Sequence, residues 1–245
     1  MAEPIIELKD ISFSAQNVEI VRNISLQFEE GKTTALVGPS GGGKSTVLKL
    51  SAGLLIPDRG AVCFRGRDVS LMSRSQNLEF RREGAVVFQD SALWANQTLY
   101  QILELPLRVH FAHMSREDRD RRIQEVAAMV GYKRDLFIRP AMLSMGEQKL
   151  IAFARAMLCR PSLLYLDEWT ESLDDDAAYR LIMIIKRMQE ENKTIIFVSH
   201  DFRVIKSLAD HIVMVIDGRL SLELTKDQIL ADDDMARLVE NGIAS

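Results

Sequence analysis

The sequence predicts an α/β protein with a parallel-sheet core, an antiparallel β subdomain and a helical insertion. Two segments near the N-terminus, 5–13 and 18–28, alternate apolar and polar side chains, as strands of a half-buried antiparallel sheet do. The runs 163–166 and 194–198 are continuously apolar and alternate with helix-like stretches, which indicates parallel strands covered on both faces. Between these regions, residues 90–160 have mostly helical patterns.

The first half of the chain supplies the antiparallel sheet and begins the parallel one. A turn at 30–32 leads into a predicted strand at 33–37, and a helix is predicted to start near Lys44. A short strand follows at 61–64, and the β-branched run 86–88 predicts another.

The insertion begins with leucine and isoleucine at helical spacing over 99–105. Ser115 and Asp118 have the spacing of a capping box, which predicts the start of a charged helix over 116–130. A third helix is predicted over 144–157.

The last part of the chain returns to alternating helices and strands. A helix is predicted over 177–189 and another over 202–208. A strand at 212–216 ends in the hairpin turn Asp217-Gly218, and a terminal helix is predicted at 236–238.

Composition indicates a water-soluble globular chain of 245 residues, with 47% hydrophobic and 27% charged residues. The formal net charge of −4 gives no general attraction to nucleic acid, and none is expected as a partner. Cys63 and Cys159 stand far apart, so we expect a reducing, cytoplasmic location and neither a disulfide nor a zinc site. No apolar run is long enough to span a bilayer, so no direct membrane insertion is expected and a partner must supply any membrane association.

A glycine-rich loop between the strand 33–37 and the following helix fits the pattern G-x-x-x-x-G-K-[ST]. Its backbone N–H groups and the positive end of the helix dipole attract phosphate oxygens. Lys44 is predicted to reach the β- and γ-phosphates, and Ser45 to bind Mg²⁺. The predicted nucleotide-binding residues of this loop are Gly38, Pro39, Ser40, Gly41, Gly42, Gly43, Lys44, Ser45 and Thr46.

Three further side chains follow buried strands, where ligands of open α/β sheets collect. Asp167 comes directly after the apolar run 163–166 and is predicted to hold Mg²⁺. Glu168 is placed to polarise an attacking water, and His200 to donate to the γ-phosphate. We therefore expect Lys44, Glu168 and His200 to be catalytic.

The order of motifs resembles the nucleotide-binding domain of ABC-type ATPases, over essentially the whole chain. It consists of the phosphate loop, Gln89, the signature 143–147, the segment 163–168, Ser172-Leu173-Asp174 and His200. The resemblance implies a P-loop NTPase fold of RecA-like type in a single domain, 1–245. In that division, 1–89 and 161–245 form the catalytic core with its β subdomain, and 90–160 form the helical subdomain.

The resemblance also implies cofactors and partners. ATP and Mg²⁺ would bind between two such subunits arranged head to tail, with Ser144 and Gly146 contacting the nucleotide of the opposite subunit. Gln89 would join Mg²⁺ coordination and report the state of a permease, and Asp174 would couple the two sites. A second ATP-binding subunit, as in a homodimer, and integral-membrane permease subunits are the implied partners. The chain would then lie peripherally on the cytoplasmic face of the inner membrane.

Several positions depart from the family pattern. Met145 replaces a glycine of the signature, which removes backbone freedom, and Glu147 puts a negative charge near an anion site. Both changes are either tolerated drift or the cause of weaker closure. Ala15 stands where an aromatic residue usually stacks on adenine, while Phe13 is expected in the core. Trp169 stands where proline is common, and the sequence suggests no function for it.

The expected function is ATP hydrolysis that drives a membrane transporter. The stretches 88–94 and 99–107 resemble the ATPases of MCE-type phospholipid transporters, and Trp94 and Tyr100 either line a groove for the permease or pack inside. Transport of lipoproteins or small solutes is an alternative. From another class, the chain could be a nucleotide-dependent scaffold or clamp that serves no transporter.

Overall fold

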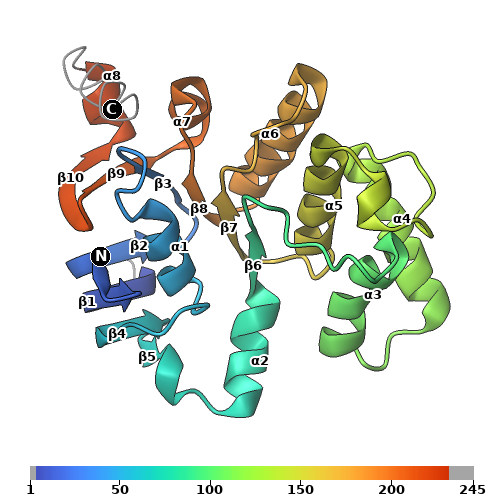
Figure 1. Ribbon diagram of the computed structural model, residues 1–245, viewed down its shortest axis with the longest axis horizontal. Helices are drawn as coiled ribbons and strands as arrows, with labels where there is room; N and C mark the ends of the chain where they lie inside the picture. Colours follow the sequence, from blue (N-terminus) through green and yellow to red (C-terminus); the bar gives the residue numbers. More distant parts are fainter. Residues whose placement is uncertain (1–3, 232–245) are drawn as a thin grey trace.

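The computed structural model describes residues 4–231, and in that range the strands form two sheets (Figure 1). One sheet has the order β2-β1-β4-β5, and its strands pair antiparallel. Its strands are β1 (Pro4–Ala15), β2 (Val18–Glu29), β4 (Arg59–Phe64) and β5 (Arg67–Asp68). The predicted antiparallel β subdomain is therefore present.

The second sheet has the order β10-β9-β3-β8-β7-β6 and is parallel from β9 to β6. Every residue of β3, β7 and β8 is buried, because helices or the other sheet cover both faces. Asp217 and Gly218 turn β9 into the antiparallel edge strand β10, both with positive φ as predicted for a tight hairpin. The strands are β3 (Thr33–Val37), β6 (Gly84–Val87), β7 (Leu163–Asp167), β8 (Thr194–Val198), β9 (His211–Ile216) and β10 (Arg219–Thr225).

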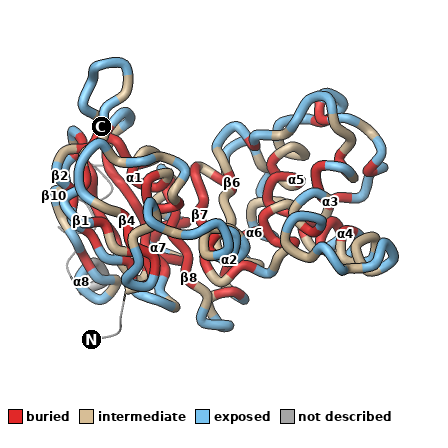
Figure 2. Tube along the Cα trace, turned by 90° about the horizontal axis from the view of Figure 1, so that it is seen from below, coloured by how far each residue is buried: buried red, intermediate tan, exposed pale blue. Residues whose placement is uncertain are grey.

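Helix α1 (Lys44–Ser51) lies between the two sheets and packs against strands of both. Helices α6 (Asp175–Glu190) and α7 (Phe202–Leu208) cover the opposite face of the parallel sheet, whose central strands are buried (Figure 2). A first hydrophobic cluster includes residues of α6 and α7, and a second includes residues of α1. Helix α8 (Lys226–Ala231) follows β10. No helix among residues 4–231 is both long and apolar enough to cross a membrane.

The segment that the sequence predicts as a helical insertion forms α3 (Leu99–His110), α4 (Arg116–Val130), the 3-10 turn η2 (Pro140–Met142) and α5 (Met145–Met157), which pack on one another (Figure 1). Ser144 begins α5 with a full capping box, in which its hydroxyl accepts from the Glu147 N–H and the Glu147 carboxylate accepts from the Ser144 N–H. The helix that carries the predicted signature therefore starts where the sequence predicts.

Some sequence-based boundaries differ from the structure. The helix α2 (Arg74–Glu83) and the 3-10 turn η1 (Val69–Leu71) were not predicted, because α2 buries only Phe80 and lacks an apolar periodicity. Strand β6 ends at Val87, one residue before the predicted end. Ser115 caps α4, yet only its own half of the predicted capping box forms. The predicted helix at 236–238 lies outside the described residues.

Candidate nucleotide-binding site

The loop between β3 and α1 has the curled backbone that the glycine pattern predicts. Gly38, Gly41 and Gly43 have φ angles of 136°, 76° and 100°, a region that favours glycine. A Cβ atom at Gly38 would lie 2.2 Å from the Val215 carbonyl oxygen, and one at Gly42 would lie 2.9 Å from the same atom. The loop therefore needs glycine both for its turns and for its close approach to β9.

The Lys44 side chain lies within the curve of this loop and is buried. Its ammonium donates to the carbonyl oxygens of Gly38 at 2.8 Å and Pro39 at 2.7 Å. Burial lowers the pKa of Lys44, and the nearby Glu168 and Asp167 carboxylates oppose that shift. Phosphate oxygens could replace the two carbonyl acceptors without moving the ammonium out of the loop.

A hydroxyl and a carboxylate meet directly beside the phosphate loop. Ser45 is in the first turn of α1, and its Oγ donates to Asp167 Oδ1 at 2.7 Å. Asp167 ends β7 and is 2% exposed. Both side chains line a cavity of about 680 Å³ together with Gln89, which follows β6. Hydroxyl, carboxylate and amide oxygens suit Mg²⁺, so this donor set fits the predicted metal.

Gln89 reaches this cavity from the strand next to β7. Its amide Nε2 donates to Glu171 Oε2 at 3.2 Å. The structure therefore brings the three predicted metal-binding residues to one edge of the sheet.

Glu168 has an unusual backbone and a buried carboxylate. Its φ of 44° lies in the left-handed region, which costs free energy for a glutamate and is often found at functional sites. His200 Nε2, after β8, lies 3.1 Å from Glu168 Oε1, an oxygen that accepts no well-aligned hydrogen bond from the described residues. Burial raises the pKa of Glu168 and Asp167 adds to that effect, whereas His200 and Lys44 lower it. Such a carboxylate can accept a proton from a nearby water.

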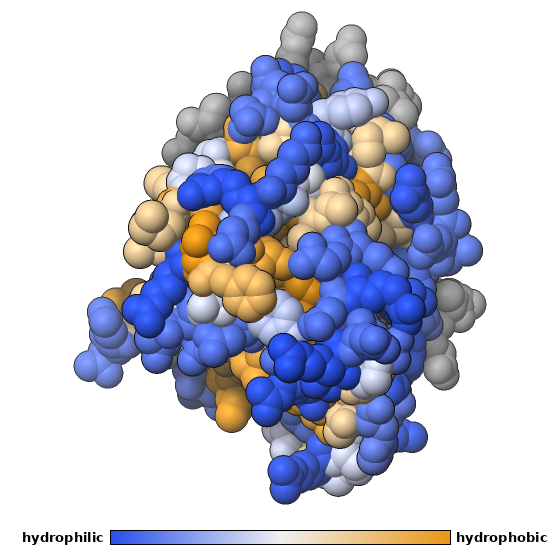
Figure 3. Space-filling model, turned by 90° about the vertical axis from the view of Figure 1, so that its right-hand side faces the viewer, coloured by the Kyte–Doolittle hydropathy of each residue, from blue (hydrophilic) through white to orange (hydrophobic). Residues whose placement is uncertain are grey.

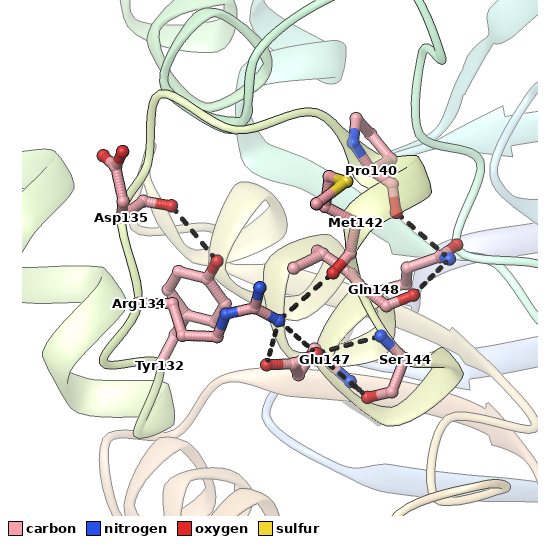
Figure 4. Close-up of polar contacts among 9 residues, drawn as sticks. Tyr132, Arg134, Asp135, Pro140, Met142, Ser144, Glu147 and Gln148 are labelled. Carbon is pink, nitrogen blue, oxygen red and sulfur yellow. Dashed lines mark hydrogen bonds and ion pairs between the residues drawn. The ribbon is translucent and has the colours of Figure 1, made fainter.

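The N-terminus of α5 contains the predicted signature residues (Figure 4). Met145 is the first residue of α5 and does not have a positive φ, so it has an ordinary helical backbone here, and it is 72% exposed. Methionine therefore fits the backbone of this position, and whether Met145 weakens closure of the dimer stays a prediction. The Glu147 carboxylate accepts a hydrogen bond from the Ser144 hydroxyl. It also forms an ion pair with Arg134, whose Nη1 lies 3.0 Å from each carboxylate oxygen.

Gly146 lies close to the loop that carries the third predicted motif. A Cβ atom at Gly146 would lie 2.9 Å from the Ser172 carbonyl oxygen, so glycine permits this contact. Two residues later, Asp174 caps α6 by accepting from the Ala177 N–H at 2.7 Å. Ser144 and Gly146 do not line the cavity that Ser45 and Asp167 share.

Two cations on α5, the buried Lys149 and the half-buried Arg155, were not predicted from the sequence. The Lys149 ammonium donates to the carbonyl oxygens of Gln89 and Glu168, and Arg155 donates to those of Ser91 and Ala92. A signal existed for Lys149, because it precedes the core residue Phe153 by four positions and so shares its helix face.

The structure also places Trp169, Phe13 and Ala15, the other positions discussed as departures from the family pattern. Trp169 is fully buried and packs against Phe153, with ring centroids 6.1 Å apart, so it joins the loop after β7 to α5. Phe13 packs against the second hydrophobic cluster, as expected for a core residue. Ala15 ends β1 opposite Val18 and offers no aromatic surface there.

The motifs match those of a known family. Residues 21–171, more than half of the chain, match the family described as ABC transporter. The chain belongs to the ABC transporter family. The family resemblance and the fold class predicted from the sequence are thus confirmed.

Relatives in this ABC family have differing cargo. The chain is 32% identical over 240 residues to the intermembrane phospholipid transport system ATP-binding protein MlaF of Haemophilus influenzae, covering 96% of this chain and 89% of the relative. It is 31% identical to the nickel import ATP-binding protein NikE of Shigella flexneri, covering 93% and 87%. It is 30% identical to the methionine import ATP-binding protein MetN of Cutibacterium acnes, covering 91% and 61%.

Solved structures of ABC cassettes have the same fold. A dimeric ATP-binding cassette in a post-hydrolysis state, bound to ADP and phosphate, superposes with a TM-score of 0.83 and 28% identity, covering 90% of this chain and 98% of that chain. The parallel core, antiparallel sheet and helical segment described above are therefore those of an ABC cassette.

Proposed function

We propose that this chain is the ATP-binding and ATP-hydrolysing subunit of an ABC transporter. The observation that carries the proposal is the convergence of Lys44, the Ser45–Asp167 pair and the Glu168–His200 pair at the carboxyl ends of three parallel strands. Five polar side chains of complementary chemistry at one sheet edge are better explained by binding of a nucleoside triphosphate than by a purely structural role.

Each of these side chains can take a distinct part in ATP hydrolysis. Lys44 binds the β- and γ-phosphates, and Glu168 orients a water and accepts its proton as the water oxygen attacks the γ-phosphorus. The bond to the bridging oxygen breaks, and ADP and phosphate leave. His200 stabilises the charge that develops on the γ-phosphate. Ser45, Gln89 and Asp167 would hold Mg²⁺, which neutralises phosphate charge when bound.

The second half of the site comes from another copy of the chain. Ser144 and Gly146 open α5, and the N–H groups and dipole of this helix N-terminus suit a γ-phosphate bound to the opposite subunit. The dimeric arrangement of the similar cassette bound to ADP and phosphate supports this proposal. ATP would hold the closed dimer together, and Asp174 would couple its two sites. Loss of the γ-phosphate would let the dimer open.

A permease partner would dock on the helical segment, 90–160. Figure 3 shows apolar side chains gathered among charged ones on the face of the molecule formed by this segment. Trp94 is 46% exposed, and Phe137, which is 70% exposed, stacks on Tyr100. Exposed aromatic residues of this kind are typical of interaction sites. Through such a partner the chain would lie on the cytoplasmic face of the inner membrane.

Phospholipid is the cargo that we propose. The support is the similarity to the phospholipid transport protein of Haemophilus influenzae along almost the full length of both chains. Nickel and methionine import proteins are similar at nearly the same identity, so small solutes are the competing cargo.

Affinity purification of the tagged chain from membranes, followed by lipid analysis, tests this proposal. We expect a polytopic membrane protein to co-purify, with phospholipid enriched over a sample prepared with Lys44→Ala. A permease with a bound small solute would contradict the cargo. A stable soluble complex without any membrane protein would instead support a nucleotide-dependent scaffold.

A further inference from the structure

Lys149 is a buried charged residue with no role in the mechanism above. It lies on α5, one turn after Gly146, and is 3% exposed. Burial of an ammonium is unfavourable unless hydrogen bonds and nearby opposite charges compensate for the lost water. The hydrogen-bond partners and neighbouring charges of Lys149 therefore indicate its role.

The Lys149 ammonium bridges the ends of two neighbouring strands. Nζ donates to the carbonyl oxygen of Gln89, after β6, and to that of Glu168 at 3.3 Å, after β7. Burial lowers the pKa of Lys149, and the carboxylates of Glu171, Asp167, Asp90 and Glu168 oppose that shift. One side chain of α5 thus holds the backbone of a predicted metal ligand and that of the proposed catalytic carboxylate.

The Glu168 backbone depends on few contacts. Its N–H donates to Val198 O at 3.2 Å, and its carbonyl accepts from the Glu171 N–H at 3.3 Å and from Lys149 Nζ at 3.3 Å. Because φ at Glu168 is 44°, this peptide has a strained conformation that its surroundings must maintain. Loss of the Lys149 contact would leave the local Glu171 N–H as the remaining donor to this carbonyl and remove its attachment to α5, so the carboxylate could change direction.

Arg155 also donates to carbonyl oxygens of the segment that follows β6, but it does not contact Glu168. It donates to Ser91 O at 3.1 Å and Ala92 O at 2.6 Å, and its guanidinium lies over the Trp94 ring. Both cations attach the segment 89–94 to α5. Of the two, Lys149 is the one that also contacts Glu168.

We infer that Lys149 is a positioning residue for ATP hydrolysis, which fixes the Glu168 and Gln89 peptides relative to α5. The inference rests on the proposed ATPase function. In consequence the direction of the catalytic carboxylate depends on the position of α5, the helix whose N-terminus is proposed to contact the opposite subunit's nucleotide. Movement of the helical segment would then change the rate of hydrolysis.

Steady-state hydrolysis by purified protein tests this inference, with kcat and KM for ATP measured separately. Lys149→Met keeps the length of the side chain and removes its donors. We expect kcat to fall about 10- to 100-fold, as when residues that orient catalytic groups are lost, with KM changed less than about twofold. Lys149→Arg retains charge and donors and should restore most of kcat. Lys206→Met is the matched control, because Lys206 is exposed on α7 and does not line the cavity that Ser45 and Asp167 share, and it should behave as wild type.

Three results would overturn the inference. These are a kcat for Lys149→Met within about twofold of wild type, a raised KM with unchanged kcat, or no recovery with Lys149→Arg. If Lys149→Met does not fold, Lys149→Gln replaces it, because its shorter neutral side chain cannot reach both carbonyls, and the same loss of kcat is expected. Absence of hydrolysis by the wild-type chain would instead contradict the proposed function itself.

Discussion

Glu168 combines three properties that ordinary surface glutamates lack. Its φ is 44°, its carboxylate is mostly buried, and His200 lies 3.1 Å from one carboxylate oxygen. Burial raises its pKa, which makes the carboxylate a stronger base for a water proton. The neighbouring Asp167 instead accepts a hydrogen bond from the Ser45 hydroxyl at Oδ1, which suits the proposed metal ligand rather than a base. We therefore propose separate roles for these two adjacent carboxylates.

Glu168→Gln should abolish most turnover while nucleotide binding is retained. The amide has nearly the same shape and cannot accept the water proton, so we expect phosphate release to fall at least about 100-fold. ATP binding, followed by fluorescence of a labelled nucleotide, should change little. Glu190→Gln, at the exposed end of α6, is the control and should keep full activity. Undiminished turnover in Glu168→Gln would refute the assigned role.

At the scale of elements, α5 joins the proposed contacts to both nucleotides. Its N-terminus is proposed to face the opposite subunit, and its Lys149 holds the loops after β6 and β7 of its own subunit. A Glu147 carboxylate without a neighbouring cation would weaken anion binding at the N-terminus of α5. The Ser144 N–H and the Arg134 guanidinium hold its pKa below the usual value, so it stays charged, and Arg134 balances that charge (Figure 4).

Arg134→Ala should therefore weaken ATP-dependent dimerisation. In a Glu168→Gln background, the uncompensated Glu147 charge would lie near the γ-phosphate at both sites of a symmetric dimer. We expect the protein concentration for half-maximal dimer to rise about three- to tenfold in sedimentation experiments at low salt. Adding Glu147→Gln should reverse the loss. No reversal would assign Arg134 a purely structural role in the loop before η2.

Residue patterns predicted the strands and helices that have a strong apolar period. Strands β7 and β8 are fully buried and read as uninterrupted apolar runs, whereas α2 buries only Phe80 and left no pattern. The phosphate loop, Asp167 and His200 could be predicted because each lies at the carboxyl end of a buried strand or within two residues after it. The contacts of Lys149 and Arg134 could not, because their partners lie 60, 19 and 13 residues away and are joined only by the fold.

For the whole molecule, we predict that one chain contains half of each ATP site and that a second copy supplies the other half. The Glu168→Gln variant allows a direct test, because hydrolysis cannot reopen the dimer. Sedimentation velocity of this variant should detect monomer without nucleotide and dimer with saturating ATP and Mg²⁺. Addition of Lys44→Ala or Ser144→Arg should keep it monomeric, since the first disrupts phosphate binding and the second obstructs the opposing helix. A Glu168→Gln chain that binds ATP and remains monomeric would show that the site is not shared between two copies.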